Sequence, residues 1–185
     1  FAALINLSRK HFATARQYCR ELEALGTIAL HQGDVLRRLD YVVQNRTAFL
    51  VALPLGFYRS EHEDRHRDVR LFRDEFDSLK LHYVDSYELA HKILRHVVGL
   101  INALERGDAR QFDQHAINAL VSGGKSNFAR IKDLEDFSRK PNAPKVAFLY
   151  RLPTLEAFWQ RAFVPQMRNA MGHHDARHDL KTGLV

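Results

Sequence analysis

A long run of apolar residues at helical spacing constrains the fold of this chain more than any other feature. Steps of three and four residues place side chains on one face of a helix. After a small change of phase near position 87, the same rhythm resumes and continues to Leu104, where Gly107 supplies a stop. We therefore predict one long helix, or two nearly collinear helices, carrying two successive apolar runs: Val69, Phe72, Phe76, Leu79 and Tyr83, then Ala90, Leu94, Val97, Ile101 and Leu104.

The N-terminal part of the chain shows two further helical patterns. The first spans 2–25 and is followed by Gly26, a residue that commonly ends helices. The second spans 27–51, before a break at Pro54 and Gly56. The apolar residues that this predicted helix carries are Ile28, Val35, Leu36, Leu39, Val42 and Val43.

The C-terminal part predicts shorter helices over 109–121 and 125–137, then a loop over 140–153 that contains three prolines. Thr154 is the expected N-cap of another helix, and Pro165 is expected to kink that helix or to start a new one. The buried stripe of this last helix is predicted to be Leu155, Phe158, Trp159, Ala162 and Phe163. The fold class is therefore all-α, a helical bundle with one long central helix.

Length and composition exclude several other classes of protein. The 185 residues suffice for one domain over 1–185, which we expect to be a fragment of a longer chain because it begins at Phe1. The lone Cys19 excludes a disulfide framework and favours a cytoplasmic location. The longest apolar stretch, 47–58, falls short of the roughly 20 residues that a membrane span needs, so no membrane partner is expected. The net charge of +6 favours polyanions such as RNA.

Two motif matches are rejected on their surroundings. His62, Glu63 and His66 match H-E-x-x-H, the zinc-peptidase pattern, but the flanking residues are charged all round, whereas a zinc site must be buried. Ser60 and Glu63 instead have the spacing of a capping box at the start of a solvated helix. The segment 122–126 is similar to the end of a P-loop, but it lacks the first glycine and follows a helix. We interpret its glycine pair as a helix stop.

The most informative segment reads R-N-x-x-G-H-H over 168–174. The spacing alone is weak evidence, because Arg110 and His115 reproduce it by chance. At Arg168 the context is richer: Asn169 follows the arginine, a glycine precedes His173, and an aromatic-rich helix leads into the segment. This context, and not the spacing, makes 168–174 the candidate site.

The segment resembles the R-x4–6-H motif of the HEPN superfamily, small all-helical proteins that include many metal-independent ribonucleases of toxin and antiviral defence systems. The resemblance implies a bundle of HEPN type in which Arg168 and His173 are catalytic and Asn169 positions substrate or the arginine. His174 is a secondary candidate, since a shift of one residue still satisfies the spacing. The resemblance also implies no metal or cofactor, RNA as substrate, a homodimer, and control by an antitoxin or a fused regulatory domain.

The residue types suit RNA cleavage by attack of the 2′-OH on the adjacent phosphate. Histidine titrates near neutral pH and can act as base or acid, while arginine keeps its charge and presents a planar fork to phosphate oxygens. On an ideal helix, residues five apart differ by roughly 7.5 Å of rise and about 140° of rotation. Arg168 and His173 therefore share a face only if the helix distorts, for which Gly172 offers a place.

Other interpretations remain open from the sequence. Arg168 could pair with a carboxylate, for which Glu156, Asp175 and Asp179 are near in sequence, and His173 could cap the end of its helix, so that the segment would have a structural role. His173, His174 and His178 with Asp175 could also form an adventitious metal site. Separately, the chain could be a non-catalytic HEPN-type module that binds nucleic acid or another protein.

Overall fold

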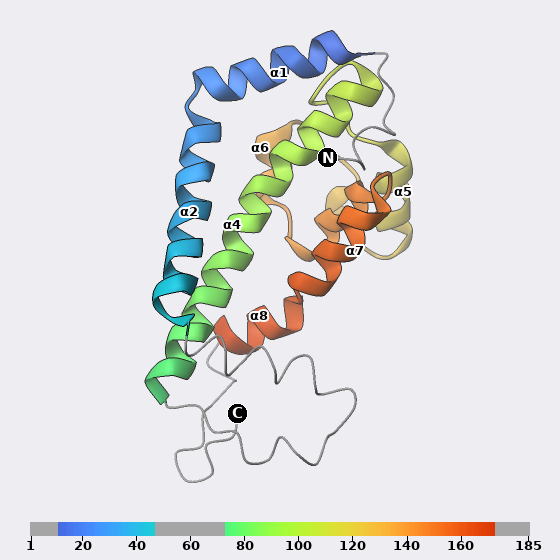
Figure 1. Cartoon of the computed structure of the whole chain (residues 1–185). Coiled ribbons are helices and arrows are strands. Elements are labelled where there is room, and N and C mark those ends of the chain that lie inside the picture. The colour runs from blue at the N-terminus through green and yellow to red at the C-terminus, as the bar shows by residue number, and fades with distance from the viewer. Residues whose placement is uncertain (1–10, 47–72, 173–185) are drawn as a thin grey trace. The chain divides into compact units, whose positions relative to one another are not determined.

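The computed structural model describes residues 11–46 and 73–172, and these residues form helices joined by turns, with no strand among them (Figure 1). The prediction of an all-α chain is confirmed. In chain order the elements are α1 (Phe12–Ala24), α2 (Thr27–Gln44), α4 (Arg73–Arg106), α5 (Gln114–Ser122), the 3₁₀ helix η3 (Ser126–Phe128), α6 (Leu134–Arg139), the 3₁₀ helix η4 (Ala143–Leu149), α7 (Pro153–Ala162) and α8 (Pro165–Gly172).

The long periodic segment is a single helix. α4 runs for 34 residues without interruption, so the change of phase in its apolar pattern does not break it. It ends where predicted, at Gly107, whose φ of 77° lies in the left-handed region that glycine adopts without a steric penalty. The predicted stops at Gly26 and the 123–124 pair are confirmed in the same way, since Gly26 and Gly124 also have positive φ.

The chain divides into two compact units. Unit 1 comprises 1–31 and 89–164, and unit 2 comprises 32–88 and 165–185. The boundaries fall inside α2 and α4, so each of these helices contributes to both units. The single domain over 1–185 stays a prediction.

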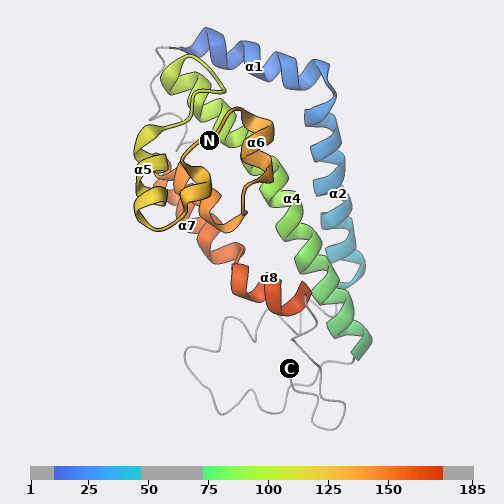
Figure 2. The ribbon, with the colours of Figure 1, turned by 180° about the vertical axis from the view of Figure 1, so that it is seen from behind.

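Aromatic packing against α4 forms the core of unit 1. Figure 2 shows α5, α6 and α7 grouped beside the part of α4 that belongs to this unit. The ring of Phe137 lies 5.1 Å from that of Phe112 and 5.2 Å from that of Phe148, the second pair edge to face. These rings pack with an apolar row on α4, namely Leu94, Val98 and Ile101. Edge-to-face pairs add stabilisation beyond the area that they bury.

α1 approaches α4 closely at one point inside unit 1. A Cβ at Gly99, in the middle of α4, would lie 2.6 Å from the Tyr18 hydroxyl oxygen. Glycine is unfavourable inside a helix by about 1 kcal/mol, so its presence here has a packing reason. The missing side chain makes room for the ring of Tyr18, which is buried.

The connecting region after α4 is less helical than predicted. The helix expected over 109–121 begins only at Gln114, because Asp113 caps it: its carboxylate accepts a hydrogen bond from the His115 N–H at 2.8 Å. The helix expected over 125–137 consists of η3 followed by α6, which begins after a second capping residue, Asp133. Capping aspartates set both starts, because their side chains satisfy N–H groups that a helix start leaves unpaired.

A buried lysine organises the segment that was predicted to be a loop. The segment 140–153 contains η4, and Lys145 within it is 2% exposed. Its ammonium group donates to the Ser138 carbonyl at 2.7 Å and to Asn142 Oδ1 at 2.8 Å, and it lies over the ring of Phe137. A buried charge is tolerated only when it is hydrogen-bonded, and these contacts satisfy it.

Three predictions around α7 and α2 need correction. Thr154 is not the N-cap of α7, because the helix begins one residue earlier at Pro153, whose fixed φ suits the first helical position. Phe158 is 57% exposed and does not belong to the buried stripe, although Trp159 does. α2 ends at Gln44, before the predicted 51, and none of its residues is buried. Pro165 starts a new helix, as predicted.

Several sequence predictions lie outside the described residues. Among them are the first residues of the helix predicted over 2–25 and the apolar positions Val69 and Phe72 of the long periodic segment. The break at Pro54 and Gly56, the capping box at Ser60 and the rejected zinc motif at His62 and His66 also lie there.

Truncating a core ring and an exposed ring should separate the two environments. Phe137→Ala removes a fully buried ring and should lower the free energy of unfolding by about 3–5 kcal/mol. Phe158→Ala is the matched control and should cost less than about 1 kcal/mol, because its ring is largely in water already. Urea unfolding followed by circular dichroism measures both, and equal losses would contradict the assignment of the core.

Candidate functional site

Arg168 forms an ion pair with a carboxylate that is distant in sequence. The residue lies on α8, and Glu88 lies on α4, both within unit 2. The Arg168 Nε and Nη2 atoms both donate to Glu88 Oε1, at 3.0 Å and 2.7 Å. Two charge-assisted hydrogen bonds from one guanidinium fix the direction of its plane as well as its position.

The pair engages only part of the guanidinium. Arginine has five N–H donors, and the contact with Glu88 uses the Nε side of the group. Within the described residues, no hydrogen bond involves Nη1. The side chains of Arg168 and Glu88 are 29% and 38% exposed, so solvent reaches the pair. The remaining donors of Arg168 are therefore suited to a bidentate contact with an oxyanion that arrives from solution.

A buried tyrosine lies in the electrostatic field of this ion pair. Burial raises the pKa of Tyr87, the charge of Glu88 raises it further, and the charge of Arg168 opposes them. Tyr87 is 3% exposed and is the one buried residue of unit 2 among those that the structure describes. Its phenol consequently stays neutral at physiological pH.

The structure describes only half of the predicted catalytic set. Asn169 follows Arg168 on α8 and is exposed, and α8 ends at Gly172. His173 and His174 lie outside the described residues, so their placement next to Arg168 stays a prediction. Arg168 does pair with a carboxylate, as the alternative interpretation allows, but its partner among the described residues is Glu88 and not Glu156. Asp175 and Asp179 lie outside the described residues. No local sequence signal identifies a partner that is eighty residues away.

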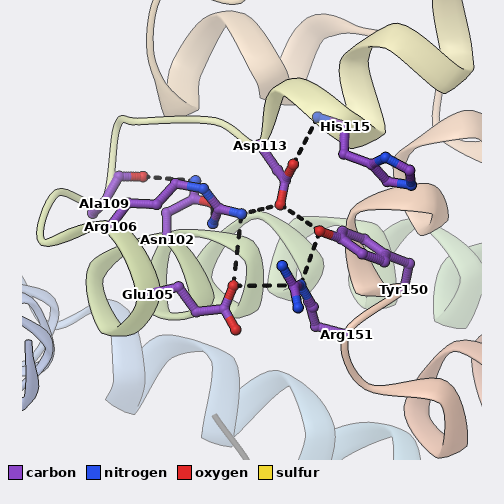
Figure 3. Close-up of polar contacts among 8 residues, drawn as sticks. All are labelled: Asn102, Glu105, Arg106, Ala109, Asp113, His115, Tyr150 and Arg151. Carbon is purple, nitrogen blue, oxygen red and sulfur yellow. Dashed lines mark hydrogen bonds and ion pairs between the residues drawn. The ribbon is translucent and has the colours of Figure 1, made fainter. Parts of the chain in front are cut away.

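A second polar cluster lies in unit 1, where the end of α4, the start of α5 and the segment before α7 meet (Figure 3). Asp113 is at its centre and forms an ion pair with Arg106. The hydroxyl of Tyr150 donates to Asp113 Oδ2 at 2.7 Å and accepts from Arg151 Nε at 2.9 Å. Glu105 lies 3.7 Å from both arginines.

This second cluster serves the fold, because its central carboxylate is occupied by internal contacts. Burial raises the pKa of Asp113, but hydrogen bonds from the Tyr150 hydroxyl and the His115 N–H, with the charge of Arg106, outweigh that effect and bring the pKa below its usual value. The cluster also contains the chance R-x4-H match. There His115 stands at the start of α5, and its ring lies 5.2 Å from that of Tyr150.

Neither a metal cluster nor a membrane-spanning helix is found in the part of the chain that the structure describes. Comparison of the sequence and structure with protein-family models, with curated proteins and with solved structures gives no match. The functional interpretation therefore rests on the motif at 168–174 and on the geometry around Arg168.

The charge of Asp113 should make the stability of unit 1 depend on acid pH. The folded state holds the pKa of this carboxyl below its value in the unfolded state. The charge of Asp113 therefore contributes fully to the free energy of unfolding above the unfolded pKa of about 4, and this contribution is lost as the pH falls further. Asp113→Asn keeps a capping side chain but removes the charge. It should lower the free energy of unfolding at pH 7 by about 1–3 kcal/mol.

The difference between wild type and Asp113→Asn should shrink as the pH is lowered from 6 to about 3, because protonation then neutralises the wild-type carboxyl as well. Chemical denaturation at a series of pH values measures this difference. A difference that stays constant over that range would show that the charge of Asp113 does not stabilise the fold.

Proposed function

We propose that this protein is a metal-independent endoribonuclease of HEPN type. The single observation that supports this best is the state of Arg168. Its guanidinium is oriented by Glu88 on one side and keeps donors for a phosphate on another, within a sequence context typical of HEPN ribonucleases. The all-α fold, with Arg168 and Asn169 on the last described helix, is consistent with this family.

In the proposed reaction the 2′-oxygen of a ribose attacks the adjacent phosphorus, and the bond from phosphorus to the 5′-oxygen of the next nucleotide breaks. His173 takes the proton from the 2′-OH or gives one to the leaving 5′-oxygen. Arg168 stabilises the charge that develops on the non-bridging phosphate oxygens. Asn169 holds the substrate or the arginine, and His174 can replace His173. The products are a 2′,3′-cyclic phosphate and a 5′-hydroxyl end.

The biological setting is also a proposal and comes from the same resemblance. It comprises a cytoplasmic toxin or antiviral effector that acts as a homodimer and is held inactive by an antitoxin or a fused regulatory domain. A homodimer would bring two copies of the Arg168 and His173 pair to one RNA. Symmetric dimers are also the commonest oligomers among soluble proteins.

A second candidate is a non-catalytic module that binds nucleic acid or protein. The specific observation in its favour is the same ion pair, because Glu88 compensates the charge of Arg168 and would do so equally in a purely structural role. The two candidates differ in whether the phosphodiester bond is cut.

Cleavage of a labelled RNA pool in EDTA tests the proposal. Arg168→Ala and His173→Ala should each reduce the cleavage rate by about 10²-fold or more, because each removes a group that acts in the transition state. Arg110→Ala and His115→Ala are matched controls at the same spacing and should cut at nearly the wild-type rate. Circular dichroism checks that every variant is folded.

Wild-type cleavage that leaves a 2′,3′-cyclic phosphate, with both site variants inactive, would support the ribonuclease. RNA binding without cleavage at any protein concentration would support the module instead. Cleavage that persists in both site variants would exclude 168–174 as the catalytic segment.

Glu88 should act on cleavage only through Arg168. Glu88→Gln should slow cleavage by about tenfold, since the guanidinium loses its charged partner, while the cost in stability should stay under about 1 kcal/mol at this half-exposed position. Adding Glu88→Gln to Arg168→Ala should then change the rate no further. A full additional tenfold loss in the double variant would show that Glu88 acts independently of the arginine.

A further inference from the structure

Helix α2 carries its apolar residues on a surface that nothing in the described part of the chain buries. Five large apolar side chains recur on one face at intervals that suit a helix. We call them the α2 stripe, and their exposed fractions are 37% for Ile28, 38% for Val35, 64% for Leu36, 57% for Leu39 and 66% for Val43. A stripe of this kind normally faces a core.

Two contacts of α2 with α4 are made by side chains outside the stripe. In unit 2, Arg38 forms an ion pair with Asp85 of α4 at 2.8 Å. The ring of Tyr41 stacks on that of His82 of α4, with centroids 4.8 Å apart. Polar side chains therefore contact the protein while much of the apolar face meets water. This reversal of the usual amphipathic arrangement marks a surface that a partner covers.

The charges of α2 favour a second copy of this chain over a polyanion. The helix contains two aspartates and two arginines and is neutral as a whole, and the stripe itself holds no charged residue. The chain carries +6, so much of its surface would repel another copy. A nucleic acid or an anionic membrane would find no cation on the stripe to bind, whereas two neutral stripes do not repel each other.

The spacing of the stripe also fits self-association. Gln32, Leu36, Leu39 and Val43 follow each other at intervals of four, three and four residues, the a/d spacing of paired helices. A single helix with this pattern is complementary to itself, so a two-fold axis can place the same surface on both sides. Gln32 adds one polar position to the seam, of the kind that selects the register of a helix pair.

We propose that the α2 stripe is a dimer interface through which two copies of this chain pair helix to helix. When two copies pair, the side chains of the α2 stripe would bury on the order of 300 Å² of apolar surface per copy. A standard interface buries about 800 Å² per partner, so α2 alone predicts a reversible, concentration-dependent dimer. The proposal gives a surface to the homodimer of the proposed function, but its test measures association and not RNA cleavage.

The test uses the full chain, freed of RNA by nuclease and high salt, in sedimentation over roughly a hundredfold range of concentration. The wild type should shift from monomer toward dimer. Leu36→Glu with Leu39→Glu places charges in the seam and should weaken association at least about tenfold. Leu30→Glu is the control: Leu30 is 60% exposed on the same helix but lies about 120° and 180° around it from Leu36 and Leu39.

A second measurement does not depend on how the charged variant folds. Leu36→Cys in a Cys19→Ser background should form covalent dimers with a short thiol cross-linker, whereas Leu30→Cys should not. A wild type that stays monomeric at every concentration would overturn the proposal, as would equal cross-linking from both positions. A dimer that persists unchanged in the doubly charged variant would overturn it as well.

Discussion

The burial of one side of α4 is the constraint on which the described structure depends. Most of the stability of a helix in a protein comes from tertiary packing of its apolar face, and α4 is 34 residues long and rich in charged residues. In unit 1 the aromatic rings of Phe112, Phe137 and Phe148 supply that packing. Leu94 is completely buried at this contact. The short helices after α4 owe their position to the same cluster, because several of its rings come from them.

Polar contacts in this protein are concentrated where elements meet. Lys145 donates a hydrogen bond to a carbonyl oxygen near the end of α6, Asp113 caps α5, and Arg168 joins α8 to α4 through Glu88. These ion pairs and hydrogen bonds differ in exposure, and that difference separates their roles. Asp113 is 8% exposed and is fully engaged with neighbours, whereas the Arg168 side chain is 29% exposed. A charge that is fixed in direction yet reachable from solvent can serve a ligand, and a sealed one serves the fold.

The organisation of α2 links the fold to association. In unit 2 its polar side contacts α4, and much of its apolar side is exposed. If both proposals hold, pairing through α2 would bring two copies of the Arg168 and His173 pair into one assembly. The proposed interface lies on α2 and the candidate catalytic arginine on α8, so separate variants can test the two proposals.

Periodicity and helix-stop residues were sufficient to predict the helical architecture. The apolar pattern leading to Leu104 predicted α4, and Gly26, Gly107 and Gly124 marked helix ends. Both signals are readable because they depend only on residues a few positions apart in the sequence. The same reasoning placed Arg168 and Asn169 on a helix that starts at Pro165. Short elements were predicted less well, since the caps at Asp113 and Asp133 decided where they begin.

What a periodic pattern faces is decided only by tertiary structure. The stripes of α2 and α4 read alike in the sequence, yet the part of the α4 stripe that lies in unit 1 is buried and the α2 stripe is exposed. Glu88 could not be matched to Arg168, nor Gly99 to Tyr18, because each pair is formed by residues about eighty positions apart. Local sequence determines which segments become helices, since helix formation depends on neighbouring residues. The partners of those helices depend on how the whole chain packs, which no local pattern encodes.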